Sequence, residues 1–303
     1  MRSAPQYVDE HQVLESCDRL VDFAAWPRAK VEYREWLDNF DRADRPLATI
    51  MLSRFTYLSH QFVDRLFTTS FQSISNSLSR TEEGYTARLV AWQQYCDEVI
   101  AVPVMGETPN PADSGWGFAR KARQLLGIAE NRLMHPPQAI EAMLAEPERP
   151  IVFVDDFVGS GAQFLRTWRR AYLTSLGPRS IGTLGHRGTI HYCNVMMTEY
   201  GRDRLRREAP TVRLVTGNLI PRSHNFACLG SAMWPSGLNI HGAAFARRIG
   251  ASLGYNKSDG SLRDWRGFHR LGLGVALEDS TPDANLPMFF SDAHGWRPLV
   301  RRS

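Results

Sequence analysis

Residues 151–163 read IVFVDDFVGSGAQ, the most informative stretch of the chain. Four apolar residues lead into two adjacent carboxylates, Asp155 and Asp156, after which come a Gly-Ser-Gly turn and an apolar pattern of helical spacing. A short continuous apolar run is typical of a strand that is buried on both faces of a parallel sheet. We therefore predict a strand over residues 151–155, with the acidic pair at its carboxyl end, and a helix that begins at Ala162.

This order of residue types predicts a sugar-phosphate site. Ligands of open α/β sheets bind outside the carboxyl ends of the strands. Carboxylates accept hydrogen bonds from vicinal sugar hydroxyls or hold a hydrated Mg²⁺, whereas backbone N–H groups at a helix N-terminus bind phosphate. We expect ribose hydroxyls at the acidic pair and a 5′-phosphate at the turn. The residues expected to contact the phosphate are Gly159, Ser160, Gly161, Ala162 and Gln163.

Each part of this stretch also has an ordinary structural interpretation. Adjacent aspartates before a turn often cap a helix, and Gly-Ser-Gly is common in loops. The ordered set is more specific than either part, because strand, acidic pair, glycine turn and helix follow one another directly. The stretch is neither a Walker A loop, since it lacks the Gly-Lys-Ser/Thr ending, nor a GxGxxG dinucleotide turn.

The composition is that of an ordinary globular protein, with 43% hydrophobic and 11% aromatic residues in a chain of 303. No apolar run is long enough to span a bilayer, and the N-terminus lacks the apolar segment of a signal peptide. The four cysteines form no CxxC pair, so we expect neither a disulfide framework nor a zinc site. These features predict a cytoplasmic protein that does not enter a membrane.

The net charge of +4 comes mostly from arginine, since only three of the 36 basic residues are lysine. Arginine suits bidentate phosphate contacts, but an arginine-rich solvated surface explains the same numbers. An excess of this size does not by itself indicate a nucleic-acid partner.

Residues 1–95 are predicted as a helical domain. Apolar residues recur at helical spacing in the segments 13–24, 31–40, 47–58 and 62–78. Four or five short helices indicate a packing or protein-docking bundle, or alternatively a winged-helix-like reader of DNA. No recognition helix rich in arginine and lysine stands out, which favours the bundle.

Residues 96–219 are predicted as an α/β core, because apolar runs alternate with helical patterns there. The strands are expected at residues 99–105, 151–155, 192–197 and 212–215. Such alternation is typical of a parallel sheet with crossover helices. The pattern becomes irregular over 220–303, where we expect a C-terminal hood with one strand at 273–277 and an ordered tail rich in aromatic residues.

The segment around the acidic pair resembles the signature with which type I phosphoribosyltransferases bind 5-phosphoribosyl 1-pyrophosphate (PRPP). That signature is a hydrophobic strand, two acidic residues, two apolar residues and then a small/Thr-Thr/Ser-Gly-x-Thr turn. Asp155 and Asp156 match the acidic pair, Phe157 and Val158 match the apolar pair, and the glycine turn matches the phosphate turn. The chain departs from the pattern at Gln163, where the family has threonine or serine. A glutamine amide still donates hydrogen bonds.

The resemblance implies a second loop, after the first core strand, that contacts pyrophosphate. Its residues here would be Asp113, Ser114 and Gly115, followed by a basic helix. Asp113 or Ser114 is equally suited to cap that helix, and the two roles are compatible. The resemblance also implies Mg²⁺, bound through the ligand and by Asp155 and Asp156, and a catalytic role for both aspartates in stabilising an oxocarbenium-like state.

The stretch 273–299 resembles the tail of a phosphoribosyltransferase-like subfamily from bacterial conflict systems. The residues that carry this resemblance are DSTPDANLP at 279–287 and WRPL at 296–299. Proteins of that subfamily are encoded beside defence components, including retron reverse transcriptases, and are thought to be toxic effectors. The resemblance implies an effector role in anti-phage defence, with a defence protein or a reverse transcriptase complex as the partner.

Three functions are open on the sequence alone. The first is a Mg²⁺-dependent pentosyltransferase that acts on PRPP or a nucleotide. A nucleotide-salvage phosphoribosyltransferase is one form of this function. The second is a nucleotide-binding sensor without turnover, which Gln163 favours. The third is a defence effector, which is compatible with the first. A homodimer is expected because members of the resembled family often dimerise.

Overall fold

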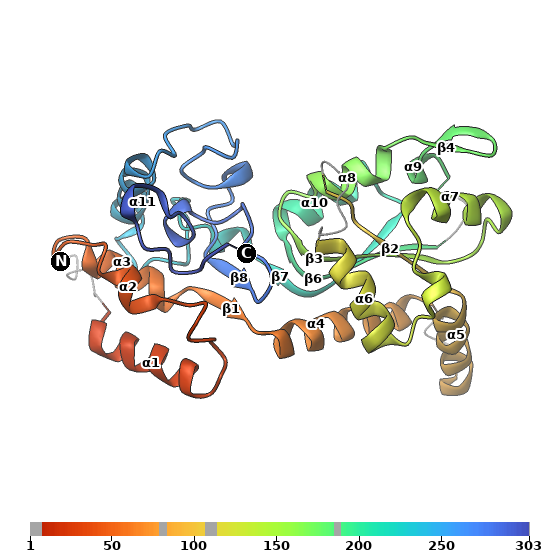
Figure 1. Ribbon diagram of the computed structural model, residues 1–303, viewed down its shortest axis with the longest axis horizontal. Coiled ribbons are helices and arrows are strands. Elements are labelled where there is room, and N and C mark those ends of the chain that lie inside the picture. Colours follow the sequence, from red (N-terminus) through yellow and green to blue (C-terminus); the bar gives the residue numbers. More distant parts are fainter. Residues whose placement is uncertain (1–7, 79–83, 107–113, 185–188, 303) are drawn as a thin grey trace. The chain divides into compact units, whose positions relative to one another are not determined.

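The chain forms two compact units, called here the terminal unit and the sheet unit. The terminal unit comprises residues 1–62 and 221–303, and the sheet unit comprises residues 63–220 (Figure 1). Within these bounds the computed structural model describes residues 8–78, 84–106, 114–184 and 189–302. No helix in the described part of the chain is both long and apolar enough to cross a membrane.

The sheet unit is built on four parallel strands in the order β2-β3-β6-β7. The strands are β2 (Ile100–Pro103), β3 (Ile151–Val158), β6 (Ile190–Thr198) and β7 (Val212–Ile220). The four strands lie in the sheet in the same order as in the sequence. Strands β3 and β6 are buried along nearly their whole length. The predicted α/β fold with a parallel sheet is confirmed.

Helices cover both faces of this sheet (Figure 1). On one face lie α7 (Pro136–Ala145), α8 (Ala162–Arg169), α9 (Ile181–Leu184) and α10 (Glu199–Glu208). On the other face lie α4 (His60–Gln72), α5 (Tyr85–Glu98) and α6 (Ser114–Leu126). Short elements complete the unit: η1 (Ser73–Ser77), η2 (Glu130–Arg132) and the hairpin of β4 (Tyr172–Thr174) with β5 (Gly177–Arg179). Parallel strands buried by helices on both sides need no polar face, which explains their continuous apolar runs.

The predicted end of β3 is wrong. The strand does not stop at Asp155 but continues through the acidic pair to Val158, paired with β6 throughout except at Asp156. Phe153 and Val158 belong to the same hydrophobic cluster although five positions separate them, so the alternation of faces shifts across the pair. Two apolar residues after the carboxylates prolong the strand, and the sequence pattern alone does not reveal this.

The buried side chain of His191 on β6 connects the sheet to α5 and η1. Its Nδ1 lies 3.1 Å from the Tyr95 hydroxyl and its Nε2 lies 3.2 Å from Ser77 Oγ. Burial, with a smaller contribution from Arg213, lowers the pKa of His191 to about 4. A neutral imidazole with both nitrogens engaged joins α5 and η1 to β6, so His191 has a structural role.

The unfolding free energy should therefore fall on mild acidification. The unfolded chain binds a proton at His191 below about pH 6.5, whereas the folded chain stays neutral there until about pH 4. Stability is lost as the pH falls through this window, by about 2 kcal/mol between pH 7.5 and 5. Urea titrations at pH 7.5 and pH 5 should show this loss in the wild type and a smaller one in His191→Gln. Equal losses in both proteins would contradict the assignment.

The terminal unit brings the two ends of the chain into one hydrophobic core. Its regular elements are α1 (Glu10–Asp22), α2 (Tyr33–Leu37), α3 (Arg45–Ser53), β1 (Thr56–Leu58), η3 (Arg222–His224), α11 (Asn239–Ser252), η4 (Phe268–Arg270), β8 (Val275–Leu277), η5 (Pro287–Phe289) and η6 (Ala293–Gly295). The Trp36 ring stacks on Phe289 with centroids 5.6 Å apart, and its Nε1 donates to the Met288 carbonyl at 2.7 Å. The tail is therefore ordered, as the sequence indicated.

Strand β1 corrects the helix expected over residues 47–58. The helix ends at Ser53, and residues 56–58 pair in parallel with β8.

The division expected from the sequence had boundaries after residues 95 and 219, whereas the compact units divide after residues 62 and 220. Phe67, Phe71 and Tyr95 are buried among the helices of the sheet unit. An amphipathic pattern shows which face of a helix is buried but does not show against which distant element.

Candidate functional site

The two carboxylates of the acidic pair have different environments. Asp155 is 2% exposed; its Oδ2 accepts from the Tyr192 hydroxyl at 2.8 Å and its Oδ1 accepts from the Asp156 N–H at 3.0 Å. Asp156 is 8% exposed, and its Oδ1 accepts from the Phe157 N–H at 2.7 Å. Asp155 thus braces the strand from inside, and Asp156 is the carboxylate nearer the surface.

Burial raises the pKa of Asp155 well above its usual range. The neighbouring Asp156 carboxylate adds to this rise, while the hydrogen bond from Tyr192 opposes it. The neutral form of Asp155 is favoured because a charge is poorly solvated in the interior and close to a second carboxylate. A neutral Asp155 would lessen the repulsion that an anion meets beside this pair.

The glycine turn after β3 opens helix α8 with a left-handed residue. Gly161 has φ 72° and forms the N-cap, and α8 begins at Ala162 as predicted. The Ser160 hydroxyl accepts weakly from the Ala162 N–H at 3.4 Å. Within the described part of the chain, the N–H groups of Ser160, Gly161 and Gln163 donate to no protein acceptor. Free N–H groups at a helix N-terminus attract an anion.

Helix α10 holds the carbonyl side of the turn. The Thr198 hydroxyl donates to the Gly159 carbonyl at 2.5 Å and accepts from the Gly201 N–H at 2.9 Å. A Cβ on Gly201 would lie 2.5 Å from the Gly159 oxygen, so only glycine admits this approach. Arg204 Nη1 donates to the Ser160 carbonyl at 3.3 Å. The Gly159 and Ser160 carbonyls are thus hydrogen-bonded to Thr198 and Arg204. The N–H groups of Ser160, Gly161 and Gln163 have no such partner among the described residues and could bind a ligand.

Sequence reasoning did not select Thr198, Gly201 or Tyr192 for the site. Thr198 is the N-cap of α10, and its place directly after an apolar run and before Glu199 is a helix-start signal. That signal indicates where the helix begins but not that its cap reaches back to another turn. Tyr192 resembled any buried strand residue until its register beside β3 was known.

The second predicted loop is only partly in view. Asp113 lies outside the described residues, and Ser114 is the first residue of α6. A Cβ on Gly115 would lie 2.3 Å from the Val104 carbonyl oxygen, so Gly115 allows α6 to begin against the chain that leaves β2. This close approach is a structural reason for the glycine, and the pyrophosphate contact stays a prediction.

Two of the three basic residues of α6 form ion pairs within the sheet unit. Lys121 Nζ lies 2.5 Å from Asp64 Oδ1, and Arg123 Nη1 lies 2.9 Å from Glu130 Oε2. Both side chains are thereby committed to neighbouring elements, which argues against a phosphate-binding role for them.

The donor set fits Mg²⁺ held mainly by a ligand. Among the described residues, no group of three or more His, Cys, Asp or Glu side chains is arranged to hold a metal ion. Mg²⁺ commonly binds through one or two carboxylates together with substrate phosphates and waters, without a cage made entirely of protein atoms. Asp156 would supply such a carboxylate, with Asp155 behind it.

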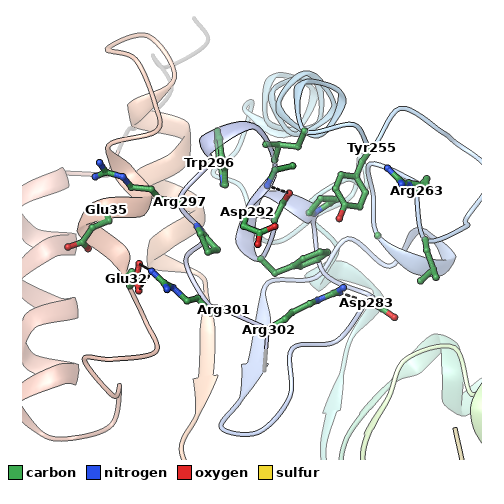
Figure 2. A pocket seen from close by; sticks show the side chains of 18 residues that line it. Glu32, Glu35, Tyr255, Arg263, Asp283, Asp292, Trp296, Arg297, Arg301 and Arg302 are labelled. Carbon is green, nitrogen blue, oxygen red and sulfur yellow. Dashed lines mark hydrogen bonds and ion pairs between the residues drawn. The ribbon is translucent and has the colours of Figure 1, made fainter.

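A cavity of about 900 Å³ lies in the terminal unit (Figure 2). The side chains described around it include four arginines and four carboxylates. Two of these arginines are neutralised, since Arg301 pairs with Glu32 at 3.0 Å and Arg302 with Asp283 at 2.5 Å. A balanced lining gives no preference for an anionic sugar phosphate, so we do not place that ligand here.

A parallel sheet whose acidic pair is followed by a glycine turn at a helix N-terminus defines a phosphoribosyltransferase-like protein. The model of the family PRTase-CE matches residues 33–302, and the chain belongs to that family. The match extends over residues of both units, so the aromatic tail is part of the family fold.

Two further comparisons add little. The search of curated proteins found no match. Among solved structures, the AQ2163 protein of Aquifex aeolicus aligns over 62% of this chain and 84% of its own, with 13% identity and a TM-score of 0.32. A similarity at this level supports no statement about ligand or activity.

Proposed function

We propose that this protein binds PRPP or a nucleotide at the acidic pair and glycine turn of the sheet unit. Asp156 would accept hydrogen bonds from the ribose hydroxyls, and the N–H groups of Ser160, Gly161 and Gln163 would bind the 5′-phosphate. The observation that carries the proposal is the turn itself. Its Gly159 and Ser160 carbonyls accept from Thr198 and Arg204, whereas the N–H groups of Ser160, Gly161 and Gln163 have no protein acceptor in the described residues.

The reaction that fits this ligand is glycosyl transfer at C1 of the ribose. The C1–O bond to pyrophosphate breaks, the pyrophosphate leaves with the electron pair, and a nitrogen or oxygen of the acceptor bonds to C1 and loses its proton. Mg²⁺ would neutralise charge on the leaving pyrophosphate. Asp156, with Asp155 behind it, would lie near the positive charge that develops on the sugar, where a carboxylate is stabilising. We place the chain among the pentosyltransferases on this basis.

Gln163 supports a second candidate, a nucleotide-binding sensor without turnover. Its side chain is half-buried and stands where the resembled signature has a hydroxyl residue. An amide reaches further than a hydroxyl and donates from a different position, so binding can persist while the phosphate is held differently. The tail resemblance supports a biological role for either candidate, namely a cytoplasmic effector in anti-phage defence that acts with a partner protein or reverse transcriptase complex.

Calorimetric titration with PRPP and Mg²⁺ tests the binding proposal. We expect saturable binding by the wild type, weaker binding when Mg²⁺ is removed by EDTA, and competition by ribose 5-phosphate. No heat of binding at millimolar PRPP would refute the proposal. Mass spectrometry of a nucleotide pool incubated with the protein then separates the candidates, because only an enzyme changes the pool. Growth arrest on expression that an Asp156 variant abolishes would support an enzymatic effector.

A further inference from the structure

Asn194 on β6 is the side chain beside the acidic pair whose hydrogen-bonding needs are left unmet. It is 0% exposed, and neither its Oδ1 nor its Nδ2 has a partner among the described residues. A buried polar group without a partner costs about 1–3 kcal/mol. Such groups are rare in native proteins and are often found where function requires them.

The register places this unpaired amide next to Asp155. Asn194 and Asp155 are partners in the parallel ladder, so their side chains point to the same face of the sheet. Tyr192 lies two residues earlier on β6 and already donates its hydroxyl to Asp155 Oδ2 at 2.8 Å. Neighbouring strands lie about 4.8 Å apart, so the side chains of paired residues come within reach of a hydrogen bond after a side-chain rotation. Each carboxylate oxygen accepts more than one hydrogen bond, so Asp155 has capacity for this donor.

We propose that Asn194 is a positioning residue for the acidic pair: when a sugar phosphate binds, its Nδ2 donates to the Asp155 carboxyl and so holds Asp156 toward the sugar hydroxyls. The two carboxylates are already linked, because the Asp156 N–H donates to Asp155 Oδ1 at 3.0 Å. This inference rests on the proposed binding of PRPP at the pair.

Asn194→Leu tests the role, because leucine has similar size and no polar atoms. The melting temperature of the unliganded variant should equal or exceed that of the wild type, since an unpaired amide is removed. Affinity for PRPP should fall about tenfold or more, the effect of losing about 1.4 kcal/mol. This combination, a loss of PRPP affinity with no fall in the melting temperature of the unliganded protein, is one that a merely structural residue would not give.

Cys193→Ala is the matched control. Cys193 is the preceding residue on β6, is fully buried, and faces the opposite side, where its Sγ lies 3.3 Å from Ser70 Oγ. The control should lower the melting temperature by leaving a cavity, yet keep the wild-type affinity. It thereby separates a damaged sheet from a damaged site. If Asn194→Leu does not fold, Asn194→Ala takes its place with the same expected loss of affinity.

The outcomes are distinguishable. An affinity of Asn194→Leu within about threefold of the wild type, which is less than 1 kcal/mol, would overturn the proposal. A clear fall of its melting temperature below that of the wild type would also overturn it, since the amide would then be stabilising the unliganded fold. A wild-type chain that binds no PRPP refutes the proposed function and this inference together, whereas equal binding by both proteins refutes this inference alone.

Discussion

Asp156→Asn is expected to weaken PRPP binding by about 100-fold or more. The change keeps the size of the side chain but removes the negative charge that accepts from sugar hydroxyls and attracts Mg²⁺. Hydrogen bonds to a charged group contribute about 1.5–3 kcal/mol, and two decades of affinity correspond to about 2.7 kcal/mol. Asparagine keeps an oxygen that can accept from the Phe157 N–H, so the replacement should leave the melting temperature nearly unchanged. Calorimetry with PRPP and Mg²⁺ measures the loss.

Asp155→Asn is the matched control for this prediction. Asp155 is braced by Tyr192 and by the Asp156 N–H, and an asparagine oxygen can accept from either. Because burial raises the pKa of Asp155, its contribution to stability is present below about pH 3.8 and is lost as the pH rises toward its folded-state value. Asparagine avoids this loss, so the variant should melt above the wild type at pH 7. Stronger loss of PRPP affinity in Asp155→Asn than in Asp156→Asn would reverse the assigned roles.

Most of the sheet was predictable from the sequence because β2, β3 and β6 are buried on both faces. Apolar residues dominate the runs at 99–105, 192–197 and 212–215, which polar residues interrupt only at Asn194 and Arg213, and each run lies on or largely overlaps an observed strand. The helix start at Ala162 was predictable for a different reason, since the glycine before it has the left-handed conformation that glycine adopts most readily.

The rest of the site depends on contacts between segments far apart in the chain. The hold of α10 on the turn joins residues about forty positions apart through one hydroxyl and one missing Cβ. The pairing of Asn194 with Asp155 depends on register, and a slip of one residue would have placed Asn194 on the other face. The same limit explains why the joint core of the two chain ends was not foreseen. Local sequence patterns show which side chains are buried, whereas only the folded structure shows which distant segments they pack against.

Gly201→Ala is expected to damage the turn without touching any ligand group. The new Cβ would lie 2.5 Å from the Gly159 carbonyl oxygen and 3.2 Å from Val158, and the first of these contacts is with backbone that cannot rotate away. The turn must therefore move by up to about 1 Å, a displacement that costs about 100-fold where geometry is critical. Overpacking costs about 1–3 kcal/mol, from which the better helix propensity of alanine subtracts about 1 kcal/mol. We expect a melting temperature lower by several degrees and PRPP affinity reduced about 100-fold.

Gly117→Ala shows whether this result comes from the contact or from the residue type. Gly117 also lies inside a helix of the sheet unit, α6, but a Cβ there would meet no atom within 4 Å. Alanine should raise helix stability by about 1 kcal/mol at this position and leave PRPP affinity as it is. If Gly201→Ala bound PRPP like the wild type while melting several degrees lower, α10 would support the fold but not the phosphate turn. Loss of affinity in Gly201→Ala alone would instead identify the contact between α10 and Gly159 as the feature that holds the turn open to an anion.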